Sequence, residues 1–377
     1  MYIPYWRLSS FYFIYFAALG AFVPYWSLYL KSVGFNSDTI GELTALLVST
    51  KMISPNLWGW IADYTGKGLR IIQIASFFTA LLFAGFLFLQ GYVWFAVITL
   101  SFSFFWNAAL PQFEALTLRY VKTEPHRYSK IRLWGSVGFI VSVLSVGQLV
   151  DKLDIVILPV VIISFLSVLW IVSLFVPDIK THPKHSKTTG LWSILKRTEV
   201  LAFLLVSLLV QLAHAPYYAF YSIYLKHYDY SASYTGLLWT LGVVAEIVLF
   251  IYMQQLLKRI SLRVLLLCSL LLSVLRWWLI AYYVNIEAII IGAQLLHAAT
   301  FGGTHIAAMH LIYHYFGEAH QGKGQALYTS LSFGLGGVLG SLYAGYAWET
   351  QSPEFVFLIA AMCCALAFLL AYIWVRD

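Results

Sequence analysis

Five ionisable side chains interrupt long apolar segments of the sequence, and their chemistry suits anion binding and proton transfer. They are Lys51, Glu114, Arg132, Glu246 and Arg276. An ionisable residue at membrane depth is costly unless it is paired or hydrated, so it usually faces a protein interior or an aqueous pathway. Three cations stand against two anions, which leaves one positive charge in surplus. A neutral sugar needs no surplus cation, so the balance favours an anionic substrate.

The two arginines are the stronger candidates for binding a carboxylate. A guanidinium presents a planar fork of N–H donors that matches a carboxylate, whereas an ammonium group is a point charge. We therefore expect Arg132 and Arg276, with Lys51 as the weaker third, to bind the substrate. The charge argument weakens if Lys51 is neutral when buried or if Arg276 lies close to an aqueous end.

Proton transfer requires a group that is charged in one state and neutral in another. Apolar surroundings favour the neutral form of a carboxyl group, so Glu246 is the first candidate and Glu114 the second. The alternative for Glu246 is a fixed pair with Arg276 or Lys51. For Glu114 a permanent pair with Arg132 is the better interpretation. The charge count and the internal repeat described below make this pair one half of a five-charge cavity, with Glu246 and Arg276 as its counterpart.

Three histidines are further candidates because imidazole titrates near neutral pH. His214 shares a helical face with Tyr218 and Tyr221, and His297 and His305 lie together in a later apolar segment. We expect His214 and His297 at the substrate and His305 in proton coupling. The alternative for each is a hydrogen-bonded histidine in helix packing.

Aromatic residues make up 18% of the sequence, and most are expected to pack or to form interfacial belts. A few could stack on a substrate ring. Trp26, Tyr218 and Tyr221 are the candidates, and the first and last of these occupy equivalent places in the internal repeat described below.

The elements that position these residues are membrane helices. The chain has 377 residues, of which 61% are hydrophobic and 10% charged, whereas a soluble domain carries about 25% charged residues. A spanning helix needs about 20 mostly apolar residues, and the first such segment lacks a small-residue cleavage site, which favours a spanning helix over a signal peptide. We predict an all-α membrane protein with twelve transmembrane helices near residues 8–30, 39–62, 71–90, 92–118, 132–150, 154–176, 199–225, 233–257, 263–284, 287–313, 325–347 and 353–375.

One longer polar connection divides the chain into two six-helix halves. The predicted halves are 1–176 and 199–377, joined by a linker at 177–198. Of the 23 lysines and arginines, 17 fall in the connections on the side of the termini and 3 on the opposite side. Basic loops stay in the cytoplasm, so both termini and the linker are expected there, in a multi-pass protein of the cell inner membrane.

The two halves repeat in sequence at a shift of 195 residues. The word SLYLK that begins at Ser27 overlies SIYLK at Ser222, and the shift carries Lys51 onto Glu246 without a gap. It also carries Trp26 onto Tyr221. Repeated halves around a site near the middle of the bilayer are typical of secondary transporters.

A short motif follows the second apolar segment. It contains Gly59, Asp63, Gly66 and Lys67, and it resembles the loop signature of the major facilitator superfamily, with departures at positions 61, 64 and 68. The resemblance implies the twelve-helix fold of that superfamily and a gating role for the loop. The alternative is an ordinary turn in which the glycines serve the backbone.

A second resemblance concerns the fourth and fifth predicted helices. Asn107, Pro111 and Glu114 share one helical face, and R-x-x-G-x-V-G follows from Arg132. This spacing is similar to that of the lactose permease family of oligosaccharide:proton symporters, in which the matching glutamate and arginine form a charge pair at the sugar site. It keeps open an oligosaccharide or nucleoside symporter as the alternative function.

A third resemblance extends over almost the whole chain. It rests on PYWSLYLKSVGFNSDTIG (24–41), KIRLWGSVGF (130–139), AHAPYYAFYSIYL (213–225), YSASYTGLLWTLGVVAE (230–246) and QLLHAATFGGTHIAAMHLI (294–312). By these words the chain is identified as a member of the phenylpropionate permease family. The family implies proton symport of 3-phenylpropionate or a similar hydrophobic monocarboxylate into the cell. Lys51 and Glu114 stand where the family accepts Arg and Asp, and an efflux transporter of the same superfamily remains an alternative.

Several function classes have no support in the sequence. It contains no phosphate-binding loop or catalytic triad, and Cys268, Cys363 and Cys364 have no metal-ligand spacing. The basic pI of about 9.1 comes from the connections, so topology explains it better than nucleic acid. We therefore expect no enzyme, cofactor or metal, and as partners a small anionic substrate, protons and the lipid bilayer, with the protein as a monomer. A membrane enzyme or receptor is disfavoured because the linker holds no catalytic or signalling domain.

Overall fold

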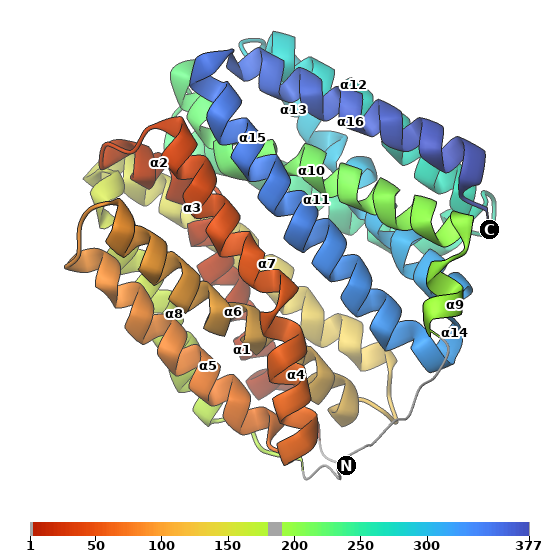
Figure 1. The fold of residues 1–377 in the computed structure, drawn as a ribbon. Coiled ribbons are helices and arrows are strands. Elements are labelled where there is room, and N and C mark those ends of the chain that lie inside the picture. The colour runs from red at the N-terminus through yellow and green to blue at the C-terminus, as the bar shows by residue number, and fades with distance from the viewer. Residues whose placement is uncertain (1–2, 180–190, 377) are drawn as a thin grey trace. The chain divides into compact units, whose positions relative to one another are not determined.

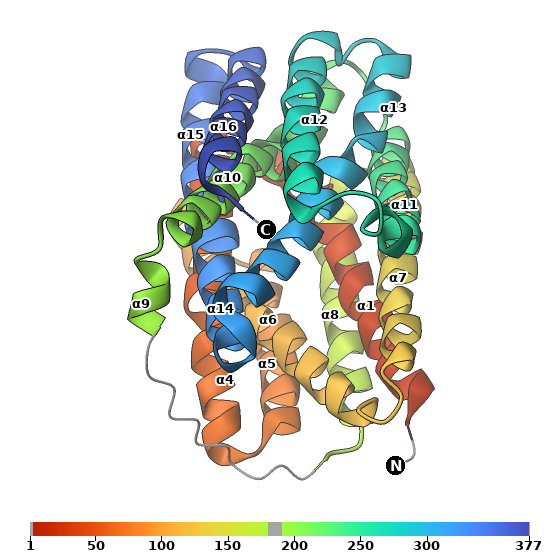
Figure 2. The same ribbon diagram turned by 90° about the vertical axis from the view of Figure 1, so that its right-hand side faces the viewer.

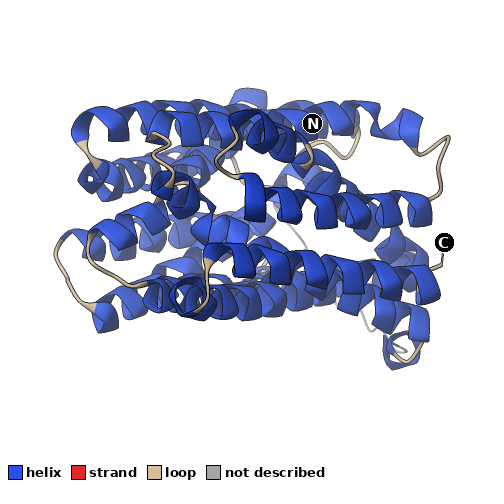
Figure 3. Cartoon of the chain, turned by 90° about the horizontal axis from the view of Figure 1, so that it is seen from above, coloured by secondary structure: helices blue, strands red, loops and turns tan. Residues whose placement is uncertain are grey.

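The described part of the chain folds entirely into helices and their connections. The structure is a computed structural model that describes residues 3–179 and 191–376, and these residues contain no strand (Figures 1 and 3). Within them, nine helices are long and apolar enough to cross a membrane. The nine are Tyr5–Ser32, Gly68–Leu87, Tyr92–Tyr120, His126–Leu153, Ile155–Leu174, Thr198–His227, Ala232–Leu256, Leu262–Tyr283 and Pro353–Trp374.

The other three predicted spans are interrupted helices. The span predicted at 39–62 consists of α3 (Ser37–Ser49), a 3-10 turn (Thr50–Met52) and α4 (Ser54–Thr65). The span at 287–313 consists of α13 (Glu287–Leu295), a π-helical turn (Ala298–Gly303) and the start of α14 (Thr304–Thr329). The span at 325–347 contains a second π-helical turn (Ser330–Gly336) and α15 (Gly337–Thr350). Proline and glycine lie at these interruptions, and both residues disfavour a regular α-helix.

The chain divides into two compact units by its internal contacts. Unit 1 comprises Met1–Phe35, Leu46–His185 and Ser231–Gly236, and unit 2 comprises Asn36–Ala45, Ser186–Tyr230 and Leu237–Asp377. The units therefore differ from the predicted halves at two short segments, 36–45 and 231–236. Residues 180–190 of the predicted linker 177–198 lie outside the described residues.

Unit 1 is built from α1 and α2 with α4 to α8. Four of its helices are α1 (Tyr5–Phe22), α2 (Trp26–Ser32), α5 (Gly68–Phe83) and α8 (Leu158–Leu174). Two further helices are uninterrupted spans, α6 (Tyr92–Tyr120) and α7 (His126–Leu153). α7 packs along α1, and α5 packs against both α6 and α8. Gly138 of α7 touches the backbone of Phe13 so closely that no side chain fits. Small residues at such crossings let membrane helices approach each other.

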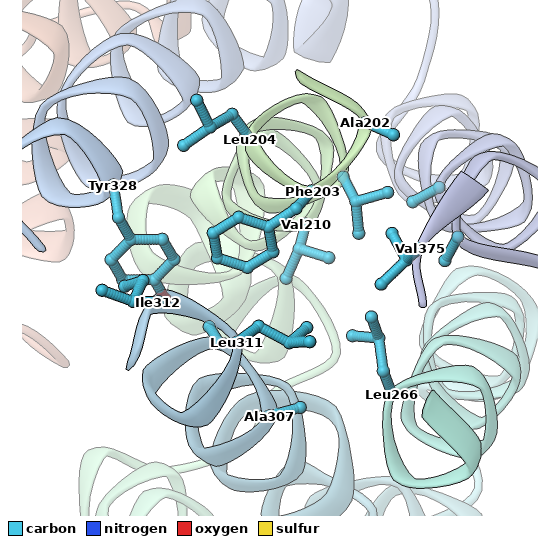
Figure 4. Packing of buried hydrophobic residues seen from close by; sticks show 14 of the residues in the cluster. Ala202, Phe203, Leu204, Val210, Leu266, Ala307, Leu311, Ile312, Tyr328 and Val375 are labelled. Carbon is cyan, nitrogen blue, oxygen red and sulfur yellow. The ribbon is translucent and has the colours of Figure 1, made fainter. Parts of the chain in front are cut away.

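Unit 2 is built mainly from α9 to α16. The remaining bounds are α9 (Leu191–Leu195), α10 (Thr198–His227), α11 (Ala232–Leu256), α12 (Leu262–Tyr283) and α16 (Pro353–Trp374). α16 packs against α10, α12 and α15 (Figure 2). Figure 4 shows a core in which Phe203 and Val210 of α10 meet Leu266 of α12 and Leu311 of α14. In the middle of α14, Gly317 adopts φ 62°, and this break falls in the connection that the sequence predicts between 313 and 325.

Candidate functional site

Unit 1 brings together two of the five membrane-embedded charges. Nε of Arg132 on α7 lies 3.6 Å from Oε1 of Glu114 on α6, and the two side chains are 31% and 36% exposed. The guanidinium carbon lies 4.1 Å from the centre of the Phe16 ring, a distance typical of a cation–π contact. The pair that the sequence favours for Glu114 is therefore present.

Lys51 lies in the 3-10 turn that separates α3 from α4, and its side chain is half-buried. The hydroxyl of the adjacent Thr50 accepts a hydrogen bond of 2.7 Å from the amide of Asn107 on α6. It also lies 3.1 Å from the hydroxyl of Ser103. These bonds hold the turn against the face of α6 that carries Glu114. Asn107, which the sequence places on one helical face with Glu114, therefore also fixes the turn that contains Lys51.

Trp26 and the predicted gating loop occupy different surroundings in unit 1. Trp26 is 6% exposed and packs against the rings of Phe22, Phe83 and Phe86. This position fits the packing alternative for aromatic residues. Its repeat partner Tyr221 lies in a polar network of unit 2 that is described below.

The gating loop begins where α4 ends. Gly66 ends the helix with φ 65°, a conformation that glycine adopts without strain. Asp63 and Lys67 are exposed, and a side chain at Gly59 would meet Gln112 of α6 at 3.5 Å. Backbone conformation explains the glycine at position 66, and packing against α6 explains the one at position 59. The charged side chains of Asp63 and Lys67 are exposed and can bind a partner.

Arg276 is the most deeply buried of the five charges. Its side chain on α12 is 0% exposed, and Nε donates to the carbonyl oxygen of Ala293 at 3.0 Å. Nη1 donates to Oγ1 of Thr300 at 3.2 Å, and Nη2 lies 3.5 Å from Oε1 of Gln294. In the part of the chain that the structure describes, Arg276 makes no ion pair. A buried guanidinium is therefore held by neutral acceptors alone.

Aromatic rings and an amide complete the surroundings of Arg276. The guanidinium carbon lies 4.5 Å from the centre of the Tyr217 ring and 4.6 Å from that of Trp277. Gln294 accepts a 2.9 Å hydrogen bond from the hydroxyl of Tyr217 and donates one of 2.6 Å to the hydroxyl of Tyr221. The set offers a cation, two hydroxyls and ring faces at one place, which suits a ligand with both a charge and an aromatic body.

Glu246 and His297 approach each other beside this set. Oε2 of Glu246 on α11 lies 4.0 Å from Nε2 of His297, and the side chains are 17% and 8% exposed. His297 directly precedes the π-helical turn, and π-turns inside helices occur often at functional sites. The alternative of a pair between Glu246 and Arg276 is not realised, because the arginine has no carboxylate partner among the described residues.

His214 lies on α10 and is 0% exposed. Its Nδ1 lies 2.8 Å from the carbonyl oxygen of Val210, which identifies this nitrogen as the donor. Its ring meets the ring of Trp277 edge to face, with centroids 4.9 Å apart. Among the described residues its Nε2 has no hydrogen-bond partner, so one nitrogen is used in packing and the other is available as an acceptor.

His305 lies beyond the π-helical turn, in line with His297. The Phe301 ring lies between them, nearly parallel to both imidazoles, with centroid distances of 5.4 Å and 6.2 Å. Nδ1 of His305 lies 3.4 Å from the hydroxyl of Tyr328. Both groups line a cavity of about 20 Å³, which has room for about one water molecule.

Sequence reasoning missed two residues of the unit 2 site, Gln294 and Tyr217. Gln294 is 0% exposed and Tyr217 is 1% exposed. The sequence does contain a signal for Gln294, because it is a lone amide in an apolar segment. It lies three residues before His297, and residues three apart share one side of a helix. Tyr218, which was a candidate, is half-buried, with its ring centroid 6.1 Å from that of Trp239.

The helical fold and its buried charges define the class of protein first: a multi-pass α-helical membrane transporter with a polar site among interrupted helices. The chain belongs to the MFS_1 like family, whose sequence model matches residues 5–359. The predicted all-α membrane fold of the major facilitator superfamily is thus confirmed. So is the resemblance to the phenylpropionate permease family, through a relative described next.

Three known proteins that resemble the chain are transporters or probable transporters. A probable 3-phenylpropionic acid transporter of Escherichia coli (strain K12) is 33% identical over 355 residues, which cover 90% of this chain and 89% of that protein. A putative nucleoside transporter of the same organism is 26% identical over 366 residues, covering 91% and 84%. The crystal structure of a single-substitution mutant of the nucleoside transporter NupG superimposes with a TM-score of 0.88 at 16% identity, over 99% of this chain and 100% of that chain. The last likeness shows the fold alone.

Proposed function

We propose that the chain is a proton-coupled symporter that takes up 3-phenylpropionate or a similar hydrophobic monocarboxylate across the cell inner membrane. The observation that carries the proposal is Arg276, a fully buried cation held by neutral acceptors between two aromatic rings. A cation in such surroundings gains strongly from an anionic partner. The 33% identical relative is a probable transporter of an aryl carboxylate, which supports the same substrate class.

The carboxylate of the substrate would replace the longest of the three hydrogen bonds of Arg276. At 3.5 Å, the contact between Nη2 and Gln294 is the weakest of the three. Gln294 has Tyr217 and Tyr221 as its other partners, so it stays satisfied when the arginine turns to the substrate. The rings of Tyr217 and Trp277 then contact the aromatic body.

The proton site is proposed at Glu246 and His297. The two groups lie 4.0 Å apart beside the arginine network, so protonation there changes the charge that an incoming carboxylate meets. Glu114 instead pairs with Arg132 in unit 1. We keep Arg132 and Lys51 as further proposed cations for the substrate. Cytoplasmic termini, a monomeric state and the gating role of Asp63 belong to the same proposal.

A nucleoside or oligosaccharide symporter is the second candidate. It is favoured by the 26% identical relative, a putative nucleoside transporter that matches 91% of this chain. The amide and hydroxyls of Gln294, Tyr217 and Tyr221 could bind a neutral polar ligand as well. Such a ligand would have no need of the charge of Arg276, and that difference separates the two candidates. An efflux transporter would share the site and differ in direction.

The binding test compares an acid with its neutral analogue. We expect 3-phenylpropionate to raise the thermal unfolding temperature of the purified protein, because a ligand that binds the folded state stabilises it. We expect 3-phenylpropionamide, uridine and maltose to have little effect. Arg276→Gln should weaken binding of the acid about 30-fold or more, the usual cost of removing one partner of a buried charge pair.

The control for this test is the exposed Arg70→Gln, which should bind like the wild type. Equal binding of the acid and the amide, or an Arg276→Gln variant that folds and binds the acid normally, would contradict the proposed role of Arg276. A rise with uridine or maltose instead would favour the second candidate.

A further inference from the structure

His214 leaves one hydrogen-bond acceptor of unit 2 unused. Its side chain lies on α10 and is 0% exposed, and its Nδ1 lies 2.8 Å from the carbonyl oxygen of Val210. A carbonyl oxygen can only accept, so Nδ1 carries the proton and Nε2 of the neutral ring is an acceptor. Among the described residues this Nε2 has no hydrogen-bond partner. A buried polar atom without a partner is costly, and each such atom calls for an explanation.

The ring of His214 lies beside the residues that we propose to hold the substrate. It meets the ring of Trp277 edge to face, with centroids 4.9 Å apart, and the centre of the Trp277 ring lies 4.6 Å from the guanidinium carbon of Arg276. One tryptophan ring therefore contacts both the cation and the imidazole. Tyr217, which also contacts this guanidinium, lies three residues after His214 and hence on the same side of α10.

The π-helical turn Ala298–Gly303 contacts the same two groups. Oγ1 of Thr300 accepts a hydrogen bond of 3.2 Å from Nη1 of Arg276, and the ring of the next residue, Phe301, lies 6.0 Å from the ring of His214. Consecutive residues of one turn thus reach the cation and the imidazole. All of these residues belong to unit 2, so the arrangement does not depend on unit 1.

The other two histidines of this region have different partners. Nε2 of His297 lies 4.0 Å from Oε2 of Glu246, and Nδ1 of His305 lies 3.4 Å from the hydroxyl of Tyr328. Nδ1 of His297 also lacks a partner among the described residues, but this histidine faces a carboxylate. Among the described residues no carboxylate pairs with His214, so its role is that of a neutral acceptor.

We propose that Nε2 of His214 accepts a hydrogen bond from a hydroxyl group of the substrate, and that the preferred substrates are aryl carboxylates with a hydroxyl on the ring. The inference rests on the proposed function, because it takes the carboxylate to bind Arg276. An aryl carboxylate has its carboxylate at one end and the ring substituents at the other, as the cation and the imidazole require. A site that binds a substrate hydroxyl disfavours the analogue without it, because the polar group of the site is then left unpaired.

The first test uses wild-type protein and a series of ligands. Isothermal titration calorimetry measures the dissociation constants of 3-phenylpropionate and of the three isomers with one hydroxyl on the ring. We expect at least one isomer to bind about tenfold more tightly than the parent acid, the gain from one hydrogen bond to an acceptor that is otherwise unpaired. The methoxy analogue with its substituent at the same ring position has no O–H donor and should bind no better than the parent acid.

The second test locates the preference at His214. The measured quantity is the ratio of the dissociation constant of the parent acid to that of the preferred isomer, taken on the same protein, so that a general loss of affinity cancels. We expect the ratio to fall from about ten to about one in His214→Phe, which removes the acceptor. His214→Gln keeps an acceptor oxygen and should keep part of the preference. The exposed His227→Phe on the same helix is the matched control and should keep the wild-type ratio.

Two results would overturn the inference. One is a wild-type protein that binds no hydroxyl isomer more tightly than the parent acid, as expected if a water molecule satisfies Nε2 instead. The other is a preference that persists in folded His214→Phe, or in His214→Leu where the phenylalanine variant does not fold. Binding of 3-phenylpropionate itself is retained in both cases, so the proposed function would stand. A wild-type protein that binds none of these acids would contradict the proposed function and this inference with it.

Discussion

At the scale of single residues, the surroundings of Arg276 distinguish it from the other charges in the membrane-spanning segments. Arg132 has Glu114 at 3.6 Å, whereas Arg276 has a carbonyl, a hydroxyl and an amide. Desolvation of an ion is compensated only by good geometry and further hydrogen bonds. Among the described side chains no carboxylate pairs with this guanidinium. We propose that the carboxylate of the substrate is the missing anion.

Glu246→Gln tests the proton site at the same scale. Glutamine keeps the size of the side chain but cannot take up or release a proton, so we expect net uptake against a concentration gradient to be lost. Exchange of labelled for unlabelled substrate needs no net proton transfer and should persist. The measurement is uptake and exchange in proteoliposomes.

The exposed Glu42→Gln is the matched control for Glu246→Gln and should accumulate substrate like the wild type. A Glu246→Gln variant that still concentrates substrate to the wild-type level would exclude Glu246 as the proton carrier. In that case His297, 4.0 Å away, or His305 would become the candidate.

At the scale of elements, the structure differs from the sequence prediction where helices are interrupted. The apolar segments are visible in the sequence because a span needs about 20 apolar residues. The π-helical turns Ala298–Gly303 and Ser330–Gly336 are not visible, because hydrophobicity does not change there. Their glycines weaken the α-helix, but which turn opens depends on packing, as at Gly302 against Glu246 and Phe250.

Glycine positions give a prediction about how elements pack. Gly138→Ala should destabilise the protein by about 1–3 kcal/mol, because the added methyl group overpacks the crossing of α7 with α1. Gly292→Ala should have no destabilising effect, since no atom other than the neighbouring backbone of its own helix lies within 4 Å of the place its side chain would take. Thermal unfolding in detergent measures both.

The comparison between the two glycines is the useful quantity, since each variant adds one methyl group to a helix. Equal unfolding temperatures for Gly138→Ala and Gly292→Ala would contradict the close approach of α1 and α7 in unit 1.

At the scale of the whole molecule, composition and charge predict the class well. The apolar segments and the sequence stretches that resemble the phenylpropionate permease family both predict a transporter of the major facilitator superfamily. The comparisons confirm this class. The candidate site was predicted less completely. Charges in apolar segments are conspicuous, so Arg276 and Glu246 are found from the sequence. Gln294 and Tyr217 are ordinary in type, and only the fold shows that they connect to the arginine.

The contacts at two helix starts show the same limit of sequence reasoning. The repeat shift identifies Ser37, the first residue of α3, and Ala232, the first residue of α11, as equivalent. Nothing in the sequence pattern indicates that the backbone N–H of Ser37 donates a hydrogen bond to Glu349, or that of Ala232 to Asp151. Partners so far apart in the chain are brought together only by the packing of complete helices.

The most direct test of the central claim is transport of labelled 3-phenylpropionate into proteoliposomes under an imposed pH gradient, acidic outside. The account predicts accumulation above the external concentration, its loss when a protonophore removes the gradient, and no accumulation by Arg276→Gln. The account would be contradicted if folded wild-type protein showed no gradient-driven uptake of this acid or of any other aryl carboxylate. It would also be contradicted if uptake were unchanged when the protonophore is added.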